Sequence, residues 1–150
     1  MSNPTKENIL TNYEKEFIIR IMKQVELNPS VAKKHKEEHY AVDFDGVLAH
    51  YSSWEEQGNQ VGKPIQPMIK KVKSWLRKGI KVSIFTARLT HGAIESEKQI
   101  LLIQNFLREN DLPDNLQITP LKMSYFTHFV DDRAYHVIPN TGIIEGNMGI

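Results

Sequence analysis

The chain alternates between short apolar runs and longer segments in which apolar residues recur every three or four positions. The short runs occupy residues 40–44, 81–85, 116–119 and 126–130, as is typical of buried strands, while residues 142–150 give only weak strand signals. Helical spacing marks residues 68–76 and 96–110, with Gly79 and Pro113 as end signals. Strands separated by helices predict an α/β fold with right-handed crossovers and a doubly wound parallel sheet.

A separate amphipathic segment precedes this pattern. Over residues 6–25 the apolar positions form one helical stripe: Leu10, Tyr13, Phe17, Ile18, Ile21 and Met22. Pro29 ends this predicted N-terminal helix, and a charged run over residues 33–39 leads into the first strand. We therefore expect a helical appendage and linker at residues 1–38 and a core at residues 39–150. The helix is expected either to pack on the chain's own core or to form a contact between two copies.

Polar residues follow three of the predicted strands. Asp43 and Asp45 end the first, residues 86–88 end the second, and Asp131 and Asp132 end the fourth. In open parallel sheets, ligands bind beyond the carboxyl ends of the strands. These side chains are therefore expected to share one crevice.

Four carboxylates at one sheet edge favour a particular chemistry. Buried carboxylates cost several kcal/mol each unless a cation or donors compensate them, so their gathering calls for a metal. Oxygen ligands without histidine or cysteine favour Mg²⁺. Such an ion beside a hydroxyl and a lysine makes a receptor for a phosphoryl group, and phosphoryl transfer is the reaction class that fits.

Composition removes several other classes. The 150-residue chain contains no cysteine, which excludes a disulfide framework and a thiol nucleophile and favours a cytoplasmic location. No segment approaches the roughly 20 apolar residues of a membrane span, so no membrane partner is expected. The formal charge of +1 provides no global basic field, and nucleic acid is expected only as a substrate.

Four segments together resemble a known superfamily. The run Ala41-Val42-Asp43-Phe44-Asp45-Gly46-Val47-Leu48 is similar to the first motif of the haloacid dehalogenase superfamily. Residues 83–88 look like its second motif, Lys122 stands where the lysine of the third is found, and residues 129–134 look like the fourth. The resemblance covers residues 40–138, and it is closest to the small capless hydrolases of bacteria and phages. It implies a Rossmann-like core without a cap domain.

The resemblance implies a hydrolase with two acidic groups in different roles. Asp43 would be the nucleophile that forms an aspartyl-phosphate, and Asp45 would protonate the leaving oxygen and then activate water. The expected protein is a Mg²⁺-dependent phosphatase acting on a small phosphorylated molecule or on a phosphate-ended polymer.

The remaining implied roles concern the phosphate and the metal. Thr86 and the neighbouring backbone amide would hold phosphoryl oxygens, and Lys122 would neutralise charge. Contacts with substrate are implied for Gly46, Ala87 and Arg88, and Gly46 would also permit a tight turn after the acids. Mg²⁺ would be held by Asp43, the main-chain carbonyl of Asp45, and Asp131. Asp132 would either join them, act through water, or orient Lys122.

Other functions stay open at this point. A non-catalytic phosphoryl-binding protein would keep the same pocket, and a phosphatase specific for nucleotides or polynucleotides would share the chemistry. Residues 35–39 formally match the H-x-x-E-H zinc pattern, but that pattern needs a helix where a strand is predicted to begin. A phosphate-receiving signalling domain places its acid pair before its phosphorylated aspartate, whereas here the pair comes last.

Specificity in this superfamily usually resides in cap insertions, and this chain has no room for one. Residues 49–65 can form only a flap, and residues 89–115 are used by one crossover helix and its loops. We therefore expect either a large substrate or a second subunit that covers the site.

Overall fold

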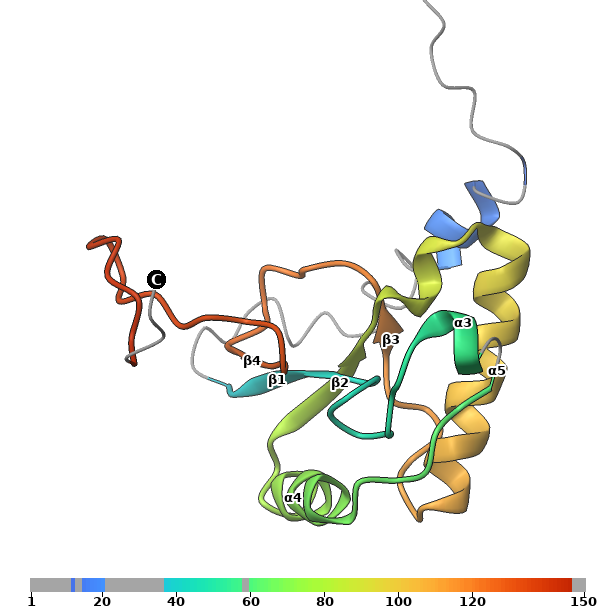
Figure 1. Cartoon of the computed structure of the whole chain (residues 1–150), viewed down its shortest axis with the longest axis horizontal. Coiled ribbons are helices and arrows are strands. Elements are labelled where there is room, and N and C mark those ends of the chain that lie inside the picture. Colours follow the sequence, from blue (N-terminus) through green and yellow to red (C-terminus); the bar gives the residue numbers. More distant parts are fainter. Residues whose placement is uncertain (1–11, 13–14, 21–36, 58–59, 147–150) are drawn as a thin grey trace, which may run out of the picture.

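The computed structural model describes residues 12, 15–20, 37–57 and 60–146. Four strands, β1 (His39–Asp43), β2 (Lys81–Phe85), β3 (Ile118–Thr119) and β4 (His128–Val130), form a parallel sheet in the order β3-β2-β1-β4 (Figure 1). The predicted α/β fold with a parallel sheet is confirmed. The strand order places β1, which carries the first pair of acids, in the interior of the sheet.

Two helices connect successive strands. The helix α4 (Gln66–Arg77) links β1 to β2, and α5 (Ala93–Glu109) links β2 to β3. The ring of Tyr40 packs edge-on against Trp75 of α4 at 4.9 Å between centroids, and Phe44 packs against Phe106 of α5 at 4.9 Å. Tyr40 and Phe44 are separated by an even number of positions, so their side chains point to the same face of the sheet. Both helices therefore cover that face.

The opposite face is covered differently. From β3 the chain returns past β2 and β1 to the far edge through residues 120–127, which form turns rather than a helix. Neither α4 nor α5 lies on this face, so the described residues lack the second helical layer of a doubly wound sheet. The rings of Tyr125 and Phe126 from this connection lie 5.1 Å from the imidazole of His39.

Some element bounds differ from the predicted ones. The helix α5 begins three residues earlier than expected, at Ala93, after Gly92 with φ +90°. The strand β4 begins at His128 rather than at Phe126, because the Phe126 amide donates to the carbonyl of Met123 in a turn (3.2 Å). The α4 end agrees with expectation, since Gly79 has φ +81° just beyond it.

The described part of the N-terminal region lies against α5. Residue 12 and residues 15–20 are helical, and the rest of the helix predicted over residues 6–25, with the linker after it, lies outside the described residues. Phe17 packs against the hydrophobic core, and Arg20 pairs with Glu97 of α5 at 2.6 Å. Ile18 and Ile19 are exposed. Among the described residues, no helix combines the length and the apolar character that crossing a membrane requires.

Two short helices complete the fold near the carboxyl ends of the strands. The first, α3 (Trp54–Gln57), lies within the flap, and the second, the 3-10 helix η1 (Ala87–Thr90), follows β2. The Trp54 ring stacks on His91 with centroids 5.1 Å apart. The flap is therefore in contact with the segment that follows β2.

Candidate active site

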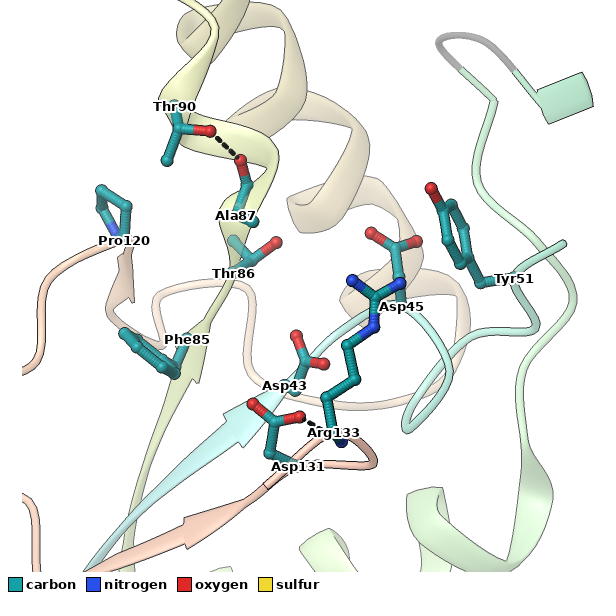
Figure 2. Close-up of a pocket in the computed structure, with 10 residues that line it drawn as sticks. All are labelled: Asp43, Asp45, Tyr51, Phe85, Thr86, Ala87, Thr90, Pro120, Asp131 and Arg133. Atoms are coloured by element: carbon teal, nitrogen blue, oxygen red, sulfur yellow. Dashed lines mark hydrogen bonds between the residues drawn. The ribbon is translucent and has the colours of Figure 1, made fainter. Parts of the chain in front are cut away.

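The register of two neighbouring strands brings Asp43 and Asp131 together. Val42 of β1 pairs with Val130 of β4, so the next residue of each strand stands at the next position of the ladder and points to the same face. One carboxylate oxygen from each of Asp43, Asp131 and Asp132 lies within 4.8 Å of the other two. Figure 2 shows Asp43 at the end of β1 and Asp131 next to it, just beyond β4.

Asp132 joins this group because β4 ends before it and the alternation of side chains no longer applies. Its carboxylate lies against Gly46, where a Cβ atom would be 2.6 Å from the Oδ2 atom of Asp132. Gly46 also has φ +82°, a conformation that favours glycine. Gly46 therefore permits both the turn after β1 and the close approach of Asp132.

Asp43 is electrostatically unusual. Burial raises the pKa of its carboxyl to about 7, and the neighbouring charges of Asp131, Asp132 and Asp45 also raise it. The amide of Phe44 donates to Oδ1 of Asp43 at 2.8 Å and opposes this shift. A bound cation would favour the ionised form of this carboxyl.

Asp45 is held in a different way from the other three acids. Arg88 donates from Nε to Oδ2 of Asp45 at 2.7 Å and from Nη2 to Oδ1 at 2.8 Å. This bidentate ion pair fixes the direction of the Asp45 carboxylate. The side chain of Asp45 is not part of the group of three carboxylates, Asp43, Asp131 and Asp132, that could hold a metal.

Arg88 does not reach the cavity as a substrate contact would. It is buried, and its guanidinium is occupied by protein acceptors. The substrate contact implied for Arg88 is therefore corrected to a contact with Asp45. The sequence shows that an arginine follows the second strand, but its partner depends on how two distant segments pack.

Thr86 and Ala87 lie where the phosphoryl group was expected. The Thr86 hydroxyl is buried and accepts from the Arg88 amide at 3.1 Å, so its own hydrogen is free to donate. Both residues line a cavity of about 260 Å³ together with Asp43, Asp45 and Asp131.

Several side chains of this cavity were not predicted from the sequence. They come from the flap, from β2 and η1, and from the segments after β3 and β4, and Figure 2 shows them around the acids: Tyr51, Phe85, Thr90, Pro120 and Arg133. The amide of Arg133 donates to Oδ1 of Asp131 at 2.8 Å, which holds that carboxylate in a turn. Tyr51 lies in a segment without a motif, so no pattern marks it.

Lys122 lies against an aromatic ring and, within the described residues, forms no ion pair with Asp43. Its ammonium is 5.3 Å from the ring centroid of Phe129, and it lines a neighbouring cavity of about 540 Å³ that also contains Asp131. No ion pair joins Lys122 to the acids in the part of the chain that the structure describes. The role implied for Lys122 therefore requires its long side chain to turn from the aromatic ring toward the phosphoryl group.

His39, the last residue of the H-x-x-E-H pattern, is part of a strand. It is buried in β1, and its Nε2 atom lies 2.6 Å from the hydroxyl of Ser83. The first two residues of that pattern lie outside the described residues. A strand does not present ligands as the helix of a zinc protease does, so this alternative is rejected.

Comparisons with models of protein families, with curated proteins and with solved structures find no match for this chain. Its function is inferred from the geometry and charge of the site.

Proposed function

We propose that the chain is a Mg²⁺-dependent phosphohydrolase in which Asp43 attacks phosphorus. One observation carries the proposal: the carboxylates of Asp43, Asp131 and Asp132 meet at adjacent strand ends, beside the buried hydroxyl of Thr86. The order of the four motifs that resemble the haloacid dehalogenase superfamily supports the same reading.

The donor set suits a hard divalent cation. Every candidate ligand atom is an oxygen, which favours Mg²⁺ over softer metals. Burial, and after it the charges of the neighbouring acids, raises the pKa of Asp43, and the guanidinium of Arg88 is bonded to Asp45 instead. When bound by Asp43, Asp131 and Asp132, Mg²⁺ would neutralise the charge of these carboxylates and polarise a phosphoryl oxygen.

The chain's own groups provide the two displacements. A carboxylate oxygen of Asp43 attacks phosphorus, the bond to the leaving oxygen breaks, and Asp45, which enters this step in its protonated form, donates its proton to that oxygen. Asp45 then takes a proton from water, which attacks the aspartyl-phosphate and releases inorganic phosphate and the Asp43 carboxylate. The Phe44 amide holds Oδ1 of Asp43, so Oδ2 is the oxygen left to attack.

Positioning of the transferred group falls to the second strand and to one lysine. The Thr86 hydroxyl and the Ala87 amide can donate to phosphoryl oxygens, and a turned Lys122 would add a positive charge. These donors act most strongly in a site from which water is excluded.

Two substitutions test the proposal. Asp43→Asn and Asp45→Asn should each lower turnover of an aryl phosphate by orders of magnitude, whereas Asp114→Asn, in an exposed ion pair with Arg108, should leave it unchanged. Acid quenching should trap a phosphorylated chain in the parent and in Asp45→Asn but not in Asp43→Asn. Chelation should abolish turnover, and Mg²⁺ should restore it.

Two outcomes would overturn this assignment. Turnover that survives exhaustive chelation would remove the metal, and a phosphorylated Asp43→Asn protein would place the nucleophile elsewhere. Tight binding of Mg²⁺ and phosphate by a parent chain that hydrolyses no phosphate ester would instead favour the non-catalytic binding role.

A further inference from the structure

Arg88 is a buried charge that donates four hydrogen bonds to protein acceptors from its five N–H groups. Its side chain is 2% exposed. Besides its two bonds to Asp45, it donates from Nη1 to Oε1 of Gln99 at 2.8 Å and from Nη2 to the carbonyl of Gln60 at 3.0 Å. A buried guanidinium is stable only when its partners are in place, so these contacts depend on one another.

Two aromatic rings complete the surroundings of Arg88. Its guanidinium carbon is 5.5 Å from the ring centroid of Phe44 and 5.5 Å from that of Trp54. Contacts of this kind between arginine and an aromatic face are attractive, more so where water is excluded. Arg88 thus touches the loop after β1, the helix α5, and two places in the flap.

The flap has few other anchors in the part that the structure describes. At its base, the amide of His50 donates to the carbonyl of Lys63 and the amide of Ile65 donates to that of Leu48, each at 2.8 Å. Farther out, the Gln57 side chain donates to the His50 carbonyl at 3.2 Å, which links the flap only to itself. The outer flap is tied to the core by the contacts of Trp54 and Gln60 with Arg88, together with the stack of Trp54 on His91 and the packing of Val61 on the hydrophobic core.

This attachment affects the catalytic cavity because Tyr51 lies between the base of the flap and Trp54. Tyr51 is half-buried and lines the same cavity as Asp43 and Asp45. A change in the flap would move the Tyr51 wall of the cavity, and a change at Arg88 would move the Asp45 carboxylate as well.

We propose that Arg88 is a positioning residue that holds the flap and the Asp45 carboxylate in one arrangement. In this arrangement Tyr51 closes the cavity and the Asp45 carboxylate has its catalytic orientation. The catalytic half rests on the proposed function, whereas the anchoring of the flap does not. The chain then provides its own cover for a small leaving group, and Tyr51 is the flap residue that contacts it.

The anchoring can be measured without any activity. The chain contains two tryptophans, so Trp75→Phe leaves Trp54 as the only one, and acrylamide quenching then reports on the flap. In this background Arg88→Gln should increase quenching of Trp54 by roughly twofold or more, as expected when a segment opens locally. Arg88→Lys should give an intermediate value, because lysine keeps the charge and loses the fork of donors. Arg108→Gln, at an exposed arginine, is the matched control and should change nothing.

Gln99→Met guards against a variant that fails to fold. It keeps the length of the buried side chain and removes the acceptor of Arg88 Nη1, while the ion pair with Asp45 remains. It should raise the quenching of Trp54 less than Arg88→Gln does. Circular dichroism identifies the variants that are folded, and unchanged quenching in folded Gln99→Met and Arg88→Lys would overturn the proposal.

Kinetics test the coupling to Asp45. Arg88→Lys should lower kcat for an aryl phosphate by about tenfold to a hundredfold and also raise KM, because both the Asp45 carboxylate and the Tyr51 side chain that lines the cavity are displaced. Tyr51→Ala should mainly raise KM. An unchanged kcat in Arg88→Lys would overturn the catalytic half of the proposal.

The two proposals can fail separately. If no variant and no parent protein hydrolyses phosphate esters but Trp54 responds to Arg88 as described, the proposed function fails and the flap anchor stands. If the parent is an active phosphatase and Trp54 does not respond, the anchor fails and the function stands.

Discussion

The two faces of the sheet are stabilised by different kinds of contact. The face under α4 and α5 is apolar, and Val42, Phe44 and Ile84 on it are fully buried. The face under residues 120–127 contains a chain of hydrogen bonds instead. There Nε2 of His39 lies 2.6 Å from the hydroxyl of Ser83, which donates to Oε1 of Gln117 at 2.8 Å, and Gln117 bonds the hydroxyl of Tyr125.

The comparison shows why the site forms where it does. Along β1, Asp43 has the same orientation as His39, so its carboxylate belongs to the polar face, while the next residue, Phe44, enters the apolar core. The helix-covered face can hold the strands rigidly by burial. The loop-covered face leaves polar side chains and half-exposed aromatic rings beside the acids.

The largest expected effect compares two phenylalanines, one on each face. Phe44→Ala should lower the free energy of unfolding by about 3–5 kcal/mol, because Phe44 is 0% exposed and its loss leaves a cavity. Phe129→Ala should lower it by only about 1–2 kcal/mol, because Phe129 is 38% exposed. Urea unfolding without Mg²⁺ measures both. Equal losses would mean that the two faces contribute alike to stability.

The next effect concerns the polar chain on the loop-covered face. Ser83→Ala should lower the free energy of unfolding by about 1–3 kcal/mol, because the buried imidazole of His39 loses its partner. The double variant with His39→Phe should be more stable than the sum of the single losses, since no polar group is then left unpaired. Simple additivity of the two losses would show that these groups are not coupled.

A smaller effect is expected at the contact between Gly46 and Asp132. Gly46→Ala should weaken Mg²⁺ binding by about tenfold, because the new Cβ would push the Asp132 carboxylate away. Gly79→Ala is the matched control: Gly79 has nearly the same φ, +81°, and no atom within 4 Å of an added Cβ. Isothermal calorimetry with Mg²⁺ measures the affinities. If both variants weaken binding equally, backbone strain and not Asp132 is responsible.

A further comparison separates two titratable groups of β1 by the sign of their pH dependence. The pKa of Asp43 is raised from 3.8 to about 7, so its contribution to stability is present below pH 3.8 and is lost as pH rises toward 7. Burial, with a smaller effect of Lys81, lowers the pKa of His39 from 6.5 to about 4, so its contribution is present above pH 6.5 and is lost as pH falls toward 4.

Melting temperatures measured without Mg²⁺ between pH 4 and 7 test both signs. Relative to the parent, Asp43→Asn should gain Tm as pH rises, and His39→Phe should gain Tm as pH falls. The difference at Asp43 should shrink when Mg²⁺ is added, because the cation compensates the charge. A Tm difference that does not vary with pH would contradict the shift of the group concerned.

The sequence predicted those features that depend on periodicity and order. The runs at residues 40–44 and 81–85 identified β1 and β2 nearly to the residue, because both strands are central and apolar. Polar residues after three strands predicted that Asp43, Thr86 and Asp131 would share a crevice, and all three line one cavity.

The features that could not be predicted depend on packing between distant segments. The bond of Arg88 to Asp45 crosses 43 positions, and the chain from His39 to Tyr125 uses residues that are ordinary in any loop or strand. The predicted doubly wound sheet implied a helical layer on the second face. Nothing in the sequence of residues 120–127 indicates that this loop covers that face instead. The place of Lys122 on Phe129 depends on a side-chain conformation that no spacing encodes.

The pairing of Val42 with Val130 also limits the positions at which residues can be inserted into or deleted from the chain. Inserting one residue into β4 would turn Asp131 to the opposite face, and inserting two would restore its face but shift it by about 6.6 Å along the strand. Either insertion would separate it from Asp43, whereas an added residue in the turns at 120–125 leaves the ladder intact. Among descendants of this chain, insertions and deletions should therefore accumulate in the connection before β4 and be eliminated from β1 and β4 themselves.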